Sequence, residues 1–311
     1  MILSASRRTD IPAFYSKWFI NRLRAGYVLT RNPVNHSQIS EITLSPKIID
    51  CIVFWTKDPQ NMIKYLQEID DRGYRYYFQF TLTPYNKILE KNLRNKEEII
   101  NTFINLSKTI GKNKIIWRYD PIILNQDIDI NFHINSFSRM CGQLHEYTNT
   151  VIISFVDLYA KLKTPFIRQI TQNEIAEISK SFYNIAAKYN LTLKACCEKT
   201  DLSQYGIKKS SCIDKDIIEK ICDCTINVQT DKNQRDGCGC IRSVDIGAYN
   251  TCKNGCVYCY ANYSENSVIN NCRRHNENGE LIIGETAATD KIIERKTESL
   301  KVFQTEMEEF L

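Results

Sequence analysis

Long apolar runs, glycine-rich loops and grouped histidines are all scarce in this chain of 311 residues. The longest apolar runs are strand-length, far short of the roughly 20 residues that a membrane-spanning helix needs, so we expect no membrane partner. Glycine, with 11 residues, forms no phosphate-binding loop. The histidines, His36, His133, His145 and His275, are scattered without ligand spacing, which argues against a histidine-based catalytic site.

A strong charge of either sign is also lacking, since the net charge is only +5 and the basic residues form no long run. This balance permits an anionic substrate, including nucleic acid, but does not require one. The first eight residues do not read as a signal peptide, because charge follows a short apolar run instead of preceding a longer one. We therefore expect a cytoplasmic protein with a single barrel-type domain over residues 1–311.

Cysteine is abundant, with 13 residues, and most of them lie between Cys196 and Cys259. An odd number, this clustering and no export signal favour metal ligation in a reducing compartment over disulfides. Cys51 and Cys141 stand apart and are expected to be small core residues. The sequence thus predicts a Cys-rich metal-binding segment over residues 196–272.

Three of these cysteines form the motif Cys252-x3-Cys256-x2-Cys259, with Tyr258 just before the last one. A [4Fe–4S] cluster held by three thiolates leaves one iron open. The spacing and the aromatic residue resemble those of radical S-adenosylmethionine (SAM) enzymes, in which the amino and carboxylate groups of SAM bind that iron. The alternatives are Zn²⁺ with a fourth ligand from elsewhere, and cysteines that are unliganded or disulfide-bonded.

Seven further cysteines precede this motif and suggest a second metal centre, either an auxiliary [4Fe–4S] cluster or a structural zinc. Cys238 and Cys240 are expected to supply two of its ligands. Cys212 and one of the adjacent Cys196 and Cys197 are expected to supply the others, with Cys196 preferred. Cys222 and Cys224 form a competing pair.

Apolar and amphipathic segments alternate along the first two thirds of the chain. Strands are predicted at 2–6, 49–55, 74–82, 115–119, 151–156 and 191–195, and helices at 14–25, 59–70, 96–110, 131–145 and 173–189. This alternation predicts βαβ units with a parallel sheet, and hence an α/β fold in the form of a complete or partial (β/α) TIM-like barrel. A further strand is possible within 243–249, and a packed helical tail is expected over 290–311.

Most of the predicted strands end in polar or charged residues, which in a parallel barrel would meet at the active-site mouth. The candidate catalytic residues at this rim are Arg7, Arg8, Arg118, Asp120 and Asp157. An arginine fork suits the carboxylate of SAM or an anionic substrate group. The alternative for each side chain is a helix cap or a pairing at the rim, and Asp120 followed by Pro is a candidate N-cap.

Three segments together resemble the DUF1848 family, whose members are prokaryotic proteins of unassigned function with a radical-SAM-like C-terminal cysteine motif. These segments are Ser6–Pro12, Trp117–Pro121 and Cys238–Asn262. In ordinary radical SAM barrels the cysteine loop follows the first strand, whereas here it comes last. We therefore expect a circularly permuted barrel, in which the strand within 243–249 pairs beside the first strand and leads into the cluster loop.

The expected function is that of a radical SAM enzyme, in which reductive cleavage of SAM starts radical chemistry on an unidentified substrate. Its expected partners are a flavodoxin- or ferredoxin-type electron donor and an unidentified substrate, for which an anionic molecule and a nucleic acid are candidates. Tyr258 and Tyr260 either pack the loop or contact the adenine of SAM, and Asp245 is a third candidate cofactor contact. The alternatives are a zinc-stabilised nucleic-acid-binding protein, with Tyr74–Phe78 as its nearest aromatic and basic segment, and a two-cluster iron–sulfur electron-transfer protein.

Overall fold

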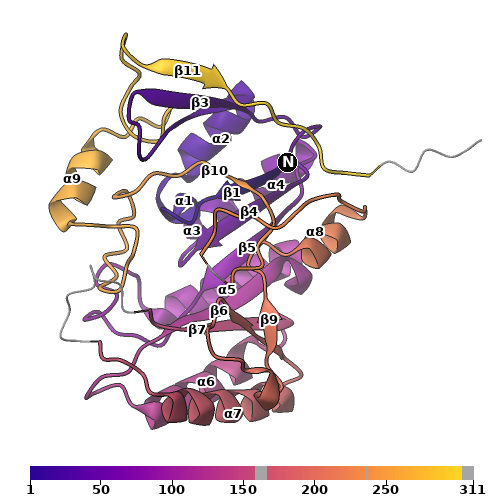
Figure 1. Ribbon diagram of the computed structural model, residues 1–311, viewed down its shortest axis with the longest axis vertical. Helices are drawn as coiled ribbons and strands as arrows, with labels where there is room; N and C mark the ends of the chain where they lie inside the picture. Colours follow the sequence, from indigo (N-terminus) through magenta and orange to yellow (C-terminus); the bar gives the residue numbers. More distant parts are fainter. Residues whose placement is uncertain (158–166, 236, 303–311) are drawn as a thin grey trace, which may run out of the picture.

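The computed structural model describes residues 1–157, 167–235 and 237–302. Its centre is an eight-stranded sheet in which every paired neighbour is parallel (Figure 1). The strands in sheet order are β10 (Val244–Asp245), β1 (Ile2–Ala5), β4 (Cys51–Thr56), β5 (Tyr76–Thr81), β6 (Ile115–Ile122), β7 (Thr150–Phe155), β8 (Thr192–Cys196) and β9 (Lys208–Ser210). The predicted α/β fold with a parallel sheet is confirmed.

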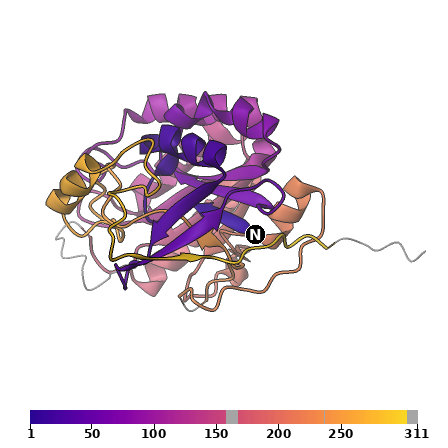
Figure 2. The same ribbon diagram turned by 90° about the horizontal axis from the view of Figure 1, so that it is seen from above.

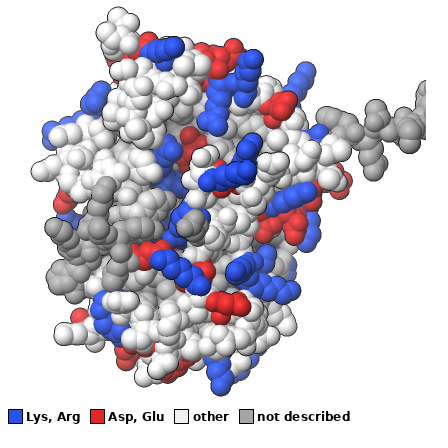
Figure 3. Space-filling view, viewed as in Figure 1, with Lys and Arg blue, Asp and Glu red and all other residues white. Residues whose placement is uncertain are grey.

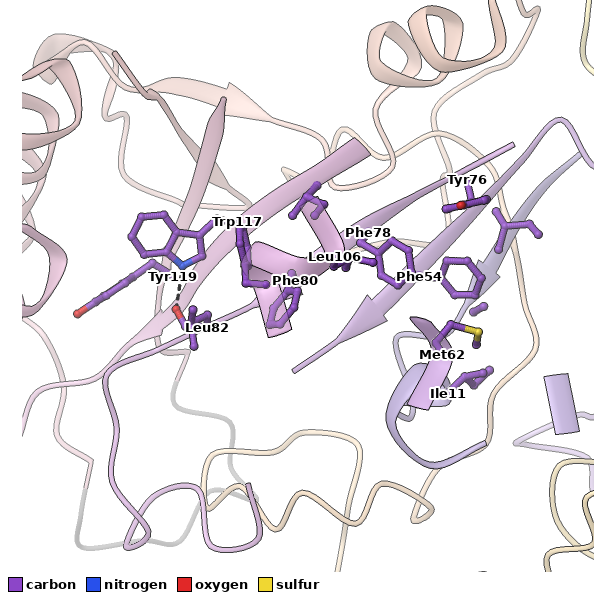
Figure 4. Close-up of a cluster of buried hydrophobic side chains, with 14 of the residues drawn as sticks. Ile11, Phe54, Met62, Tyr76, Phe78, Phe80, Leu82, Leu106, Trp117 and Tyr119 are labelled. Carbon is purple, nitrogen blue, oxygen red and sulfur yellow. Dashed lines mark hydrogen bonds between the residues drawn. The ribbon is translucent and has the colours of Figure 1, made fainter. Parts of the chain in front are cut away.

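Helices cover one face of this sheet, as Figure 2 shows. The helices that pack there are α2 (Ser16–Ala25), α3 (Gln60–Ile63), α4 (Leu66–Asp71), α5 (Lys96–Ile110), α6 (Ile130–Leu144) and α7 (Gln172–Lys188). Aromatic side chains fill much of the core between the two layers (Figure 4). Trp117 stacks on Phe137 at 5.4 Å between ring centroids, and its indole Nε1 donates to the Leu82 carbonyl oxygen at 2.9 Å.

Side chains alternate between the two faces of each strand, which gives the sheet two different cores. Phe54 and Phe78 point toward the helices, whereas Val53 and Tyr77 point to the opposite face. That opposite face is covered by the Cys-rich segment and by α8 (Lys215–Cys222). The cysteines of this segment that precede the Cys252 motif therefore lie on the inner side of the sheet, away from α2 to α7.

Local capping explains where the longer helices begin. Asn95 and Glu98 form a reciprocal capping box at the start of α5, and Thr171 and Glu174 form another at the start of α7. Each box satisfies backbone N–H groups that would otherwise lack a partner in the first turn. The helices predicted at 96–110 and 173–189 are accordingly found with little or no change in their ends.

Strand β10 pairs in parallel beside β1, with Leu3 opposite Val244 and Ser4 opposite Asp245. The last strand of the sheet thus lies next to the first one, as the permuted arrangement requires, and the cysteine loop follows it. Within the described ranges β10 and β9 are the two edges of an open sheet, and closure into a complete barrel is not seen.

A second, three-stranded sheet corrects the expectation of a helical tail over 290–311. Strand β3 (Gln38–Thr43) pairs in antiparallel fashion with β2 (Tyr27–Arg31) and in parallel with β11 (Lys291–Glu294). The two β-branched isoleucines of β11 suit an extended edge strand, and Arg31 holds Asp290 just before it at 2.7 Å. Residues 303–311 of the predicted tail lie outside the described residues. None of the described helices combines the length and the apolar character needed to cross a membrane.

Candidate metal and cofactor site

The loop that carries Cys252, Cys256 and Cys259 is fastened to the segment after β5. The Asn92 side chain donates to the Lys253 carbonyl oxygen at 2.8 Å, and the Asn92 backbone N–H donates to the Asn254 carbonyl oxygen at 3.1 Å. Cys256 also forms an antiparallel bridge with Glu90. These backbone contacts fix the loop at the carboxyl edge of the sheet, directly beyond β10.

Gly255 is required by the geometry of this loop. Its φ is +65°, a left-handed conformation that costs other residues about 1–2 kcal/mol. A Cβ at this position would also stand 2.8 Å from Nδ2 of Asn92. The glycine between Cys252 and Cys256 therefore permits both the turn and its close approach to Asn92.

A cavity of about 530 Å³ opens beside the loop. Its walls include Cys252, Cys256, Asn262 and Cys272, the last from α9 (Glu265–Arg273). Asn262 donates through Nδ2 to the Cys252 carbonyl oxygen at 2.8 Å, while its Oδ1 is buried without a hydrogen-bond partner. A buried polar atom without a partner is unfavourable, so Asn262, at the wall of the cavity, carries an acceptor that the protein itself leaves unsatisfied.

The three thiols are held protonated by their surroundings. Burial raises the pKa of Cys252 and Cys259, and it raises that of Cys256 to about 12 although Lys57 opposes the shift. Each thiolate would also repel its neighbours in the motif, since Cys252 interacts electrostatically with the other two. A bound cation would reverse this preference, because metal binding requires the thiolate form.

Beneath the loop lies a buried network around Glu90. Its carboxylate accepts hydrogen bonds from Lys57 at 2.7 Å, from Thr83 at 2.8 Å, and from Lys96 and the Tyr258 hydroxyl. Burial alone would raise the pKa of Glu90, but Lys57 and Lys96 outweigh it and lower that pKa to about 2. The Tyr258 hydroxyl therefore helps to hold the loop in place, which corresponds to packing of the loop, one of the two roles considered for this residue.

Asp10 is a second buried carboxylate near the loop. It accepts from the backbone N–H of Lys57 at 2.8 Å and from the Asn254 side chain at 3.1 Å. Burial raises its pKa to about 6, against the opposing effect of these hydrogen bonds. Asp10 therefore connects the start of the chain, the end of β4 and the cysteine loop.

Asp245 and its neighbours join β10 to the end of β1. The carboxylate accepts from the hydroxyls of Ser4 at 3.0 Å and Ser6 at 2.5 Å and from the backbone N–H of Arg7 at 2.9 Å. Arg8 approaches the same carboxylate at 4.0 Å. Through these contacts, Asp245 and Arg8 hold β10 against the end of β1.

Tyr260 links the cysteine loop to the same segment. It lies just after Cys259, is 54% exposed, and donates its hydroxyl to the Arg7 carbonyl oxygen at 2.5 Å. The aromatic ring therefore stands at the surface, and its hydroxyl has a protein partner.

A second group of thiols lies on the inner face of the sheet. The Sγ atoms of Cys196 and Cys212 are 2.8 Å apart. Cys240 lies close enough to Cys212 and Cys238 to shift their pKa values, and Cys197 lies close enough to Cys196 and Cys238 to do the same. The four ligands expected for a second centre are thus brought together, and Cys197 lies with them.

Cys222 is separated from this group. Its thiol donates to the Asp50 carbonyl oxygen at 3.1 Å and lies against Cys51. The alternative in which Cys222 and Cys224 compete as ligands is not what this structure favours. In the part of the chain that the structure describes, no set of three or more His, Cys, Asp or Glu side chains is arranged to hold a metal ion as it stands.

Two arginines and one tryptophan stand beside the second thiol group. Arg118 is buried and donates from Nη1 to Cys212 Sγ at 2.8 Å and from Nε to Asp120 at 3.1 Å. Burial alone would lower the pKa of Arg118, but Cys212 and Asp120 outweigh it and raise that pKa. The guanidinium groups of Arg7 and Arg118 both lie over the Trp55 ring, at 5.1 and 5.6 Å.

Arg7 offers an unused donor at this position. Its Nη1 donates to Gln234 at 2.8 Å, whereas its Nη2 is buried without a partner. Arg7 also interacts electrostatically with Cys240 and Cys212. Arg7 and Arg118, two of the three arginines expected at the rim, thus lie beside the second thiol group, whereas Arg8 lies beside Asp245.

The remaining acidic candidates lie at the ends of β6 and β7. Asp120 precedes a proline inside β6, where it binds Arg118 and the Ser154 hydroxyl, so the alternative of a helix N-cap does not apply to it. Asp157 forms a half-exposed ion pair with Arg235. Between them lies Glu198, whose pKa is raised to about 7, chiefly by burial.

Sequence reasoning missed several residues of this region. Lys57 directly follows β4, in the polar stretch where that strand ends, so a signal for it was present. Glu90, Asn262 and Cys272 come from loops and from α9, where no periodic pattern marks which side chains turn inward.

Comparison with known proteins gives a family. No curated protein matches the chain. Among solved structures, the C-terminal domain of a candidate chitinase from Desulfitobacterium hafniense DCB-2 is 9% identical, with a TM-score of 0.23, covering 66% of this chain and 47% of that one. The model of a domain of unknown function, DUF1848, matches residues 2–261. The chain belongs to the DUF1848 family.

Proposed function

We propose that this protein is a radical SAM-type enzyme in which Cys252, Cys256 and Cys259 bind a [4Fe–4S] cluster. One observation carries the proposal. The C-x3-C-x-Tyr-C motif forms a single loop directly beyond a strand of the parallel sheet, beside a cavity of about 530 Å³. Parallel α/β sheets bind ligands at the carboxyl ends of their strands, and that cavity volume falls in the range of about 300–1,000 Å³ usual for small-ligand sites.

The surroundings of the loop fit a three-thiolate cluster. Three half-buried thiols in one short loop, each with a raised pKa, need a cation before they can all ionise. Lys57, close to Cys256, supplies positive charge that moderates the negative charge of the thiolates. The third cysteine that lines the cavity, Cys272, is turned toward the Tyr15 hydroxyl at 3.4 Å and the Thr251 carbonyl oxygen at 3.5 Å. A [4Fe–4S] cluster bound by Cys252, Cys256 and Cys259 would therefore have one iron without a protein ligand.

The cavity also carries groups that suit SAM. The Oδ1 of Asn262 can accept a hydrogen bond from an amino group. Lys253 and Arg273 line the same cavity and can pair with a carboxylate. When bound, a reduced cluster supplies the electron that cleaves a carbon–sulfur bond of SAM. The protein side chains then have to orient SAM and keep water out.

The substrate is proposed to bind where Arg7, Arg118 and Trp55 lie. The free Nη2 of Arg7 favours an anionic group, and the Trp55 face favours a planar or apolar one. A flavodoxin- or ferredoxin-type protein is the proposed electron donor.

A nucleic-acid-binding role receives less support. Tyr74, Tyr76, Tyr77 and Phe78, the aromatic residues of the candidate segment, are all buried. Figure 3 shows Lys and Arg interspersed with Asp and Glu over the face it displays, without a continuous basic stripe.

The test uses protein purified without oxygen. Iron, sulfide and zinc are quantified, dithionite and SAM are added, and 5′-deoxyadenosine is measured. We expect about four irons for this site per chain and formation of deoxyadenosine, both lost in Cys256→Ala. Cys222→Ala is the matched control, because Cys222 is half-buried and lies away from the loop. A protein that contains zinc at this loop and no iron, and that does not cleave SAM, would refute the proposal.

A further inference from the structure

The second thiol group has a geometry that differs from that of the cysteine loop. Its members come from the end of β8, from the segment after β9, and from a Cys-Gly-Cys turn. Cys196, Cys212 and Cys240 are 5%, 5% and 2% exposed. The hydroxyl of Tyr77 and the side chain of Gln79 both donate to the Cys212 carbonyl oxygen, at 2.9 and 2.7 Å. The sheet itself therefore sets the position of this thiol.

The Cys-Gly-Cys turn is equally constrained. A Cβ on Gly239 would stand 2.6 Å from the Ser211 Oγ, so the turn packs closely against the segment that carries Cys212. Within the turn, the Cys238 sulfur accepts a hydrogen bond from the Cys240 backbone, and Cys240 Sγ accepts one from the Ile213 N–H at 3.4 Å. Backbone N–H groups thus face two of the sulfurs, as they would face thiolates.

The spacing of the sulfurs indicates a single ion. Thiolates on one tetrahedral zinc, with Zn–S bonds of about 2.3 Å, stand about 3.8 Å apart. A [4Fe–4S] cluster places its four thiolates on four separate irons and so holds them farther apart. The distance of 2.8 Å between the sulfurs of Cys196 and Cys212 is closer to the spacing at one zinc than to that of a cluster, and it needs to open by only about 1 Å for one zinc.

Positive charge beside the group also suits such a site. Four thiolates on Zn²⁺ carry a net charge of −2. Arg118 donates directly to Cys212, and Arg7 interacts electrostatically with Cys212 and Cys240, so the two guanidinium groups offset part of that charge, while Asp120 also pairs with Arg118. Buried charge of this kind is tolerated only when it is compensated.

We propose that Cys196, Cys212, Cys238 and Cys240 bind one Zn²⁺ as a closed tetrathiolate site. Binding releases the thiol protons, and neither electrons nor substrate take part. The site closes the Cys-rich segment over the inner face of the sheet and fixes Arg118 and Arg7 beside Trp55. This proposal is independent of the radical SAM proposal, because it concerns other cysteines and another metal.

The test measures metal content in anaerobically purified full-length protein expressed with both iron and zinc supplied. We expect one zinc per chain, and zinc-edge X-ray absorption with four sulfur neighbours at about 2.3 Å. Cys212→Ser and Cys240→Ser should lose the zinc and keep the iron of the cysteine loop, whereas Cys256→Ala should lose the iron and keep the zinc. Cys222→Ser, the matched control, should keep both.

Each other outcome overturns the proposal. About eight irons per chain, falling to about four in Cys212→Ser, would assign this group to a second [4Fe–4S] cluster. Zinc with nitrogen or oxygen neighbours in the wild-type protein would place that zinc elsewhere. The X-ray absorption of the wild-type protein decides the matter even where a serine variant fails to fold.

Discussion

Glu90→Gln is the substitution whose effect follows most directly from the contacts beneath the cysteine loop. The carboxylate is 1% exposed and accepts from Lys57, Lys96, Thr83 and Tyr258. An amide at this position brings N–H donors toward two ammonium groups and leaves their charge uncompensated. Breaking a buried ion pair in this way costs about 3–5 kcal/mol.

The pKa of Glu90 leads to a similar magnitude. Its fall from 4.5 to about 2 corresponds to roughly 3 kcal/mol of stability at neutral pH. Because the folded pKa is lowered, this contribution is present above about pH 4.5 and is lost as the pH falls toward about 2. The difference in unfolding free energy between the wild-type protein and Glu90→Gln should therefore shrink over that interval.

The two lysines should not be equivalent. Burial opposes the charge of both, yet the pKa of Lys57 is raised by Glu90 and Cys256, whereas burial prevails at Lys96 and lowers its pKa. We therefore expect Lys57→Met to cost more stability than Lys96→Met.

Urea unfolding of anaerobically prepared protein, followed by fluorescence, measures these differences. Glu265→Gln is the matched control, since Glu265 pairs with Lys91 at 2.9 Å at the surface, where such a pair contributes below about 1 kcal/mol. If Glu90→Gln costs no more than Glu265→Gln, or if its cost is the same at pH 3 as at pH 7, the reasoning about the buried network is refuted.

Three further predictions concern the site. Cys272→Ser should retain the iron and the SAM cleavage of the wild-type protein, because three thiolates suffice; loss of iron would show that Cys272 is a ligand. Gly255→Ala should destabilise the loop by about 1 kcal/mol or more and lower its iron occupancy. Adding Asn92→Ala to the same chain should not restore the iron occupancy, because the strained φ at position 255 remains. Full iron occupancy in Gly255→Ala would contradict this prediction. Burial raises the pKa of Glu198 from 4.5 to about 7, so the unfolding free energy should fall as the pH rises between these values. In Glu198→Gln, urea titrations should show that this free energy falls less steeply with pH. The same slope in the variant and the wild-type protein would contradict the prediction.

The parallel sheet could be read from the sequence because its strands and helices repeat in a regular order. The helix at Lys96–Ile110 has both a clear apolar face and a strong capping box, and its predicted ends are those observed. The position of β10 beside β1 was also accessible, since a cysteine loop at the carboxyl edge needs a strand before it.

The smaller sheet could not be read in the same way. Strand β11 has only four residues and pairs with β3, some 250 positions earlier in the chain. No local sequence pattern therefore indicates which strand it pairs with. Asp120-Pro121 illustrates a different limit. Its local sequence favours a helix start, but the pairing of β6 with β7 continues past it to Ile122, and Arg118 takes up the carboxylate.

The same distinction between local and long-range information applies to the cysteines. Spacing alone was enough to select Cys252, Cys256 and Cys259 as candidate cluster ligands, because all three lie in one short stretch of sequence. The choice among the seven other thiols depended on the packing of distant segments, and only the structure places Cys222 against Asp50 and away from the group around Cys212.

The most direct test of the central claim is the electron paramagnetic resonance spectrum of the reduced, anaerobic protein with and without SAM. A cluster bound by Cys252, Cys256 and Cys259 has one iron free to bind SAM, so its signal should change when SAM is added, and the signal should be absent in Cys256→Ala. An iron–sulfur signal that SAM leaves unchanged, or one that survives in Cys256→Ala, would contradict the account.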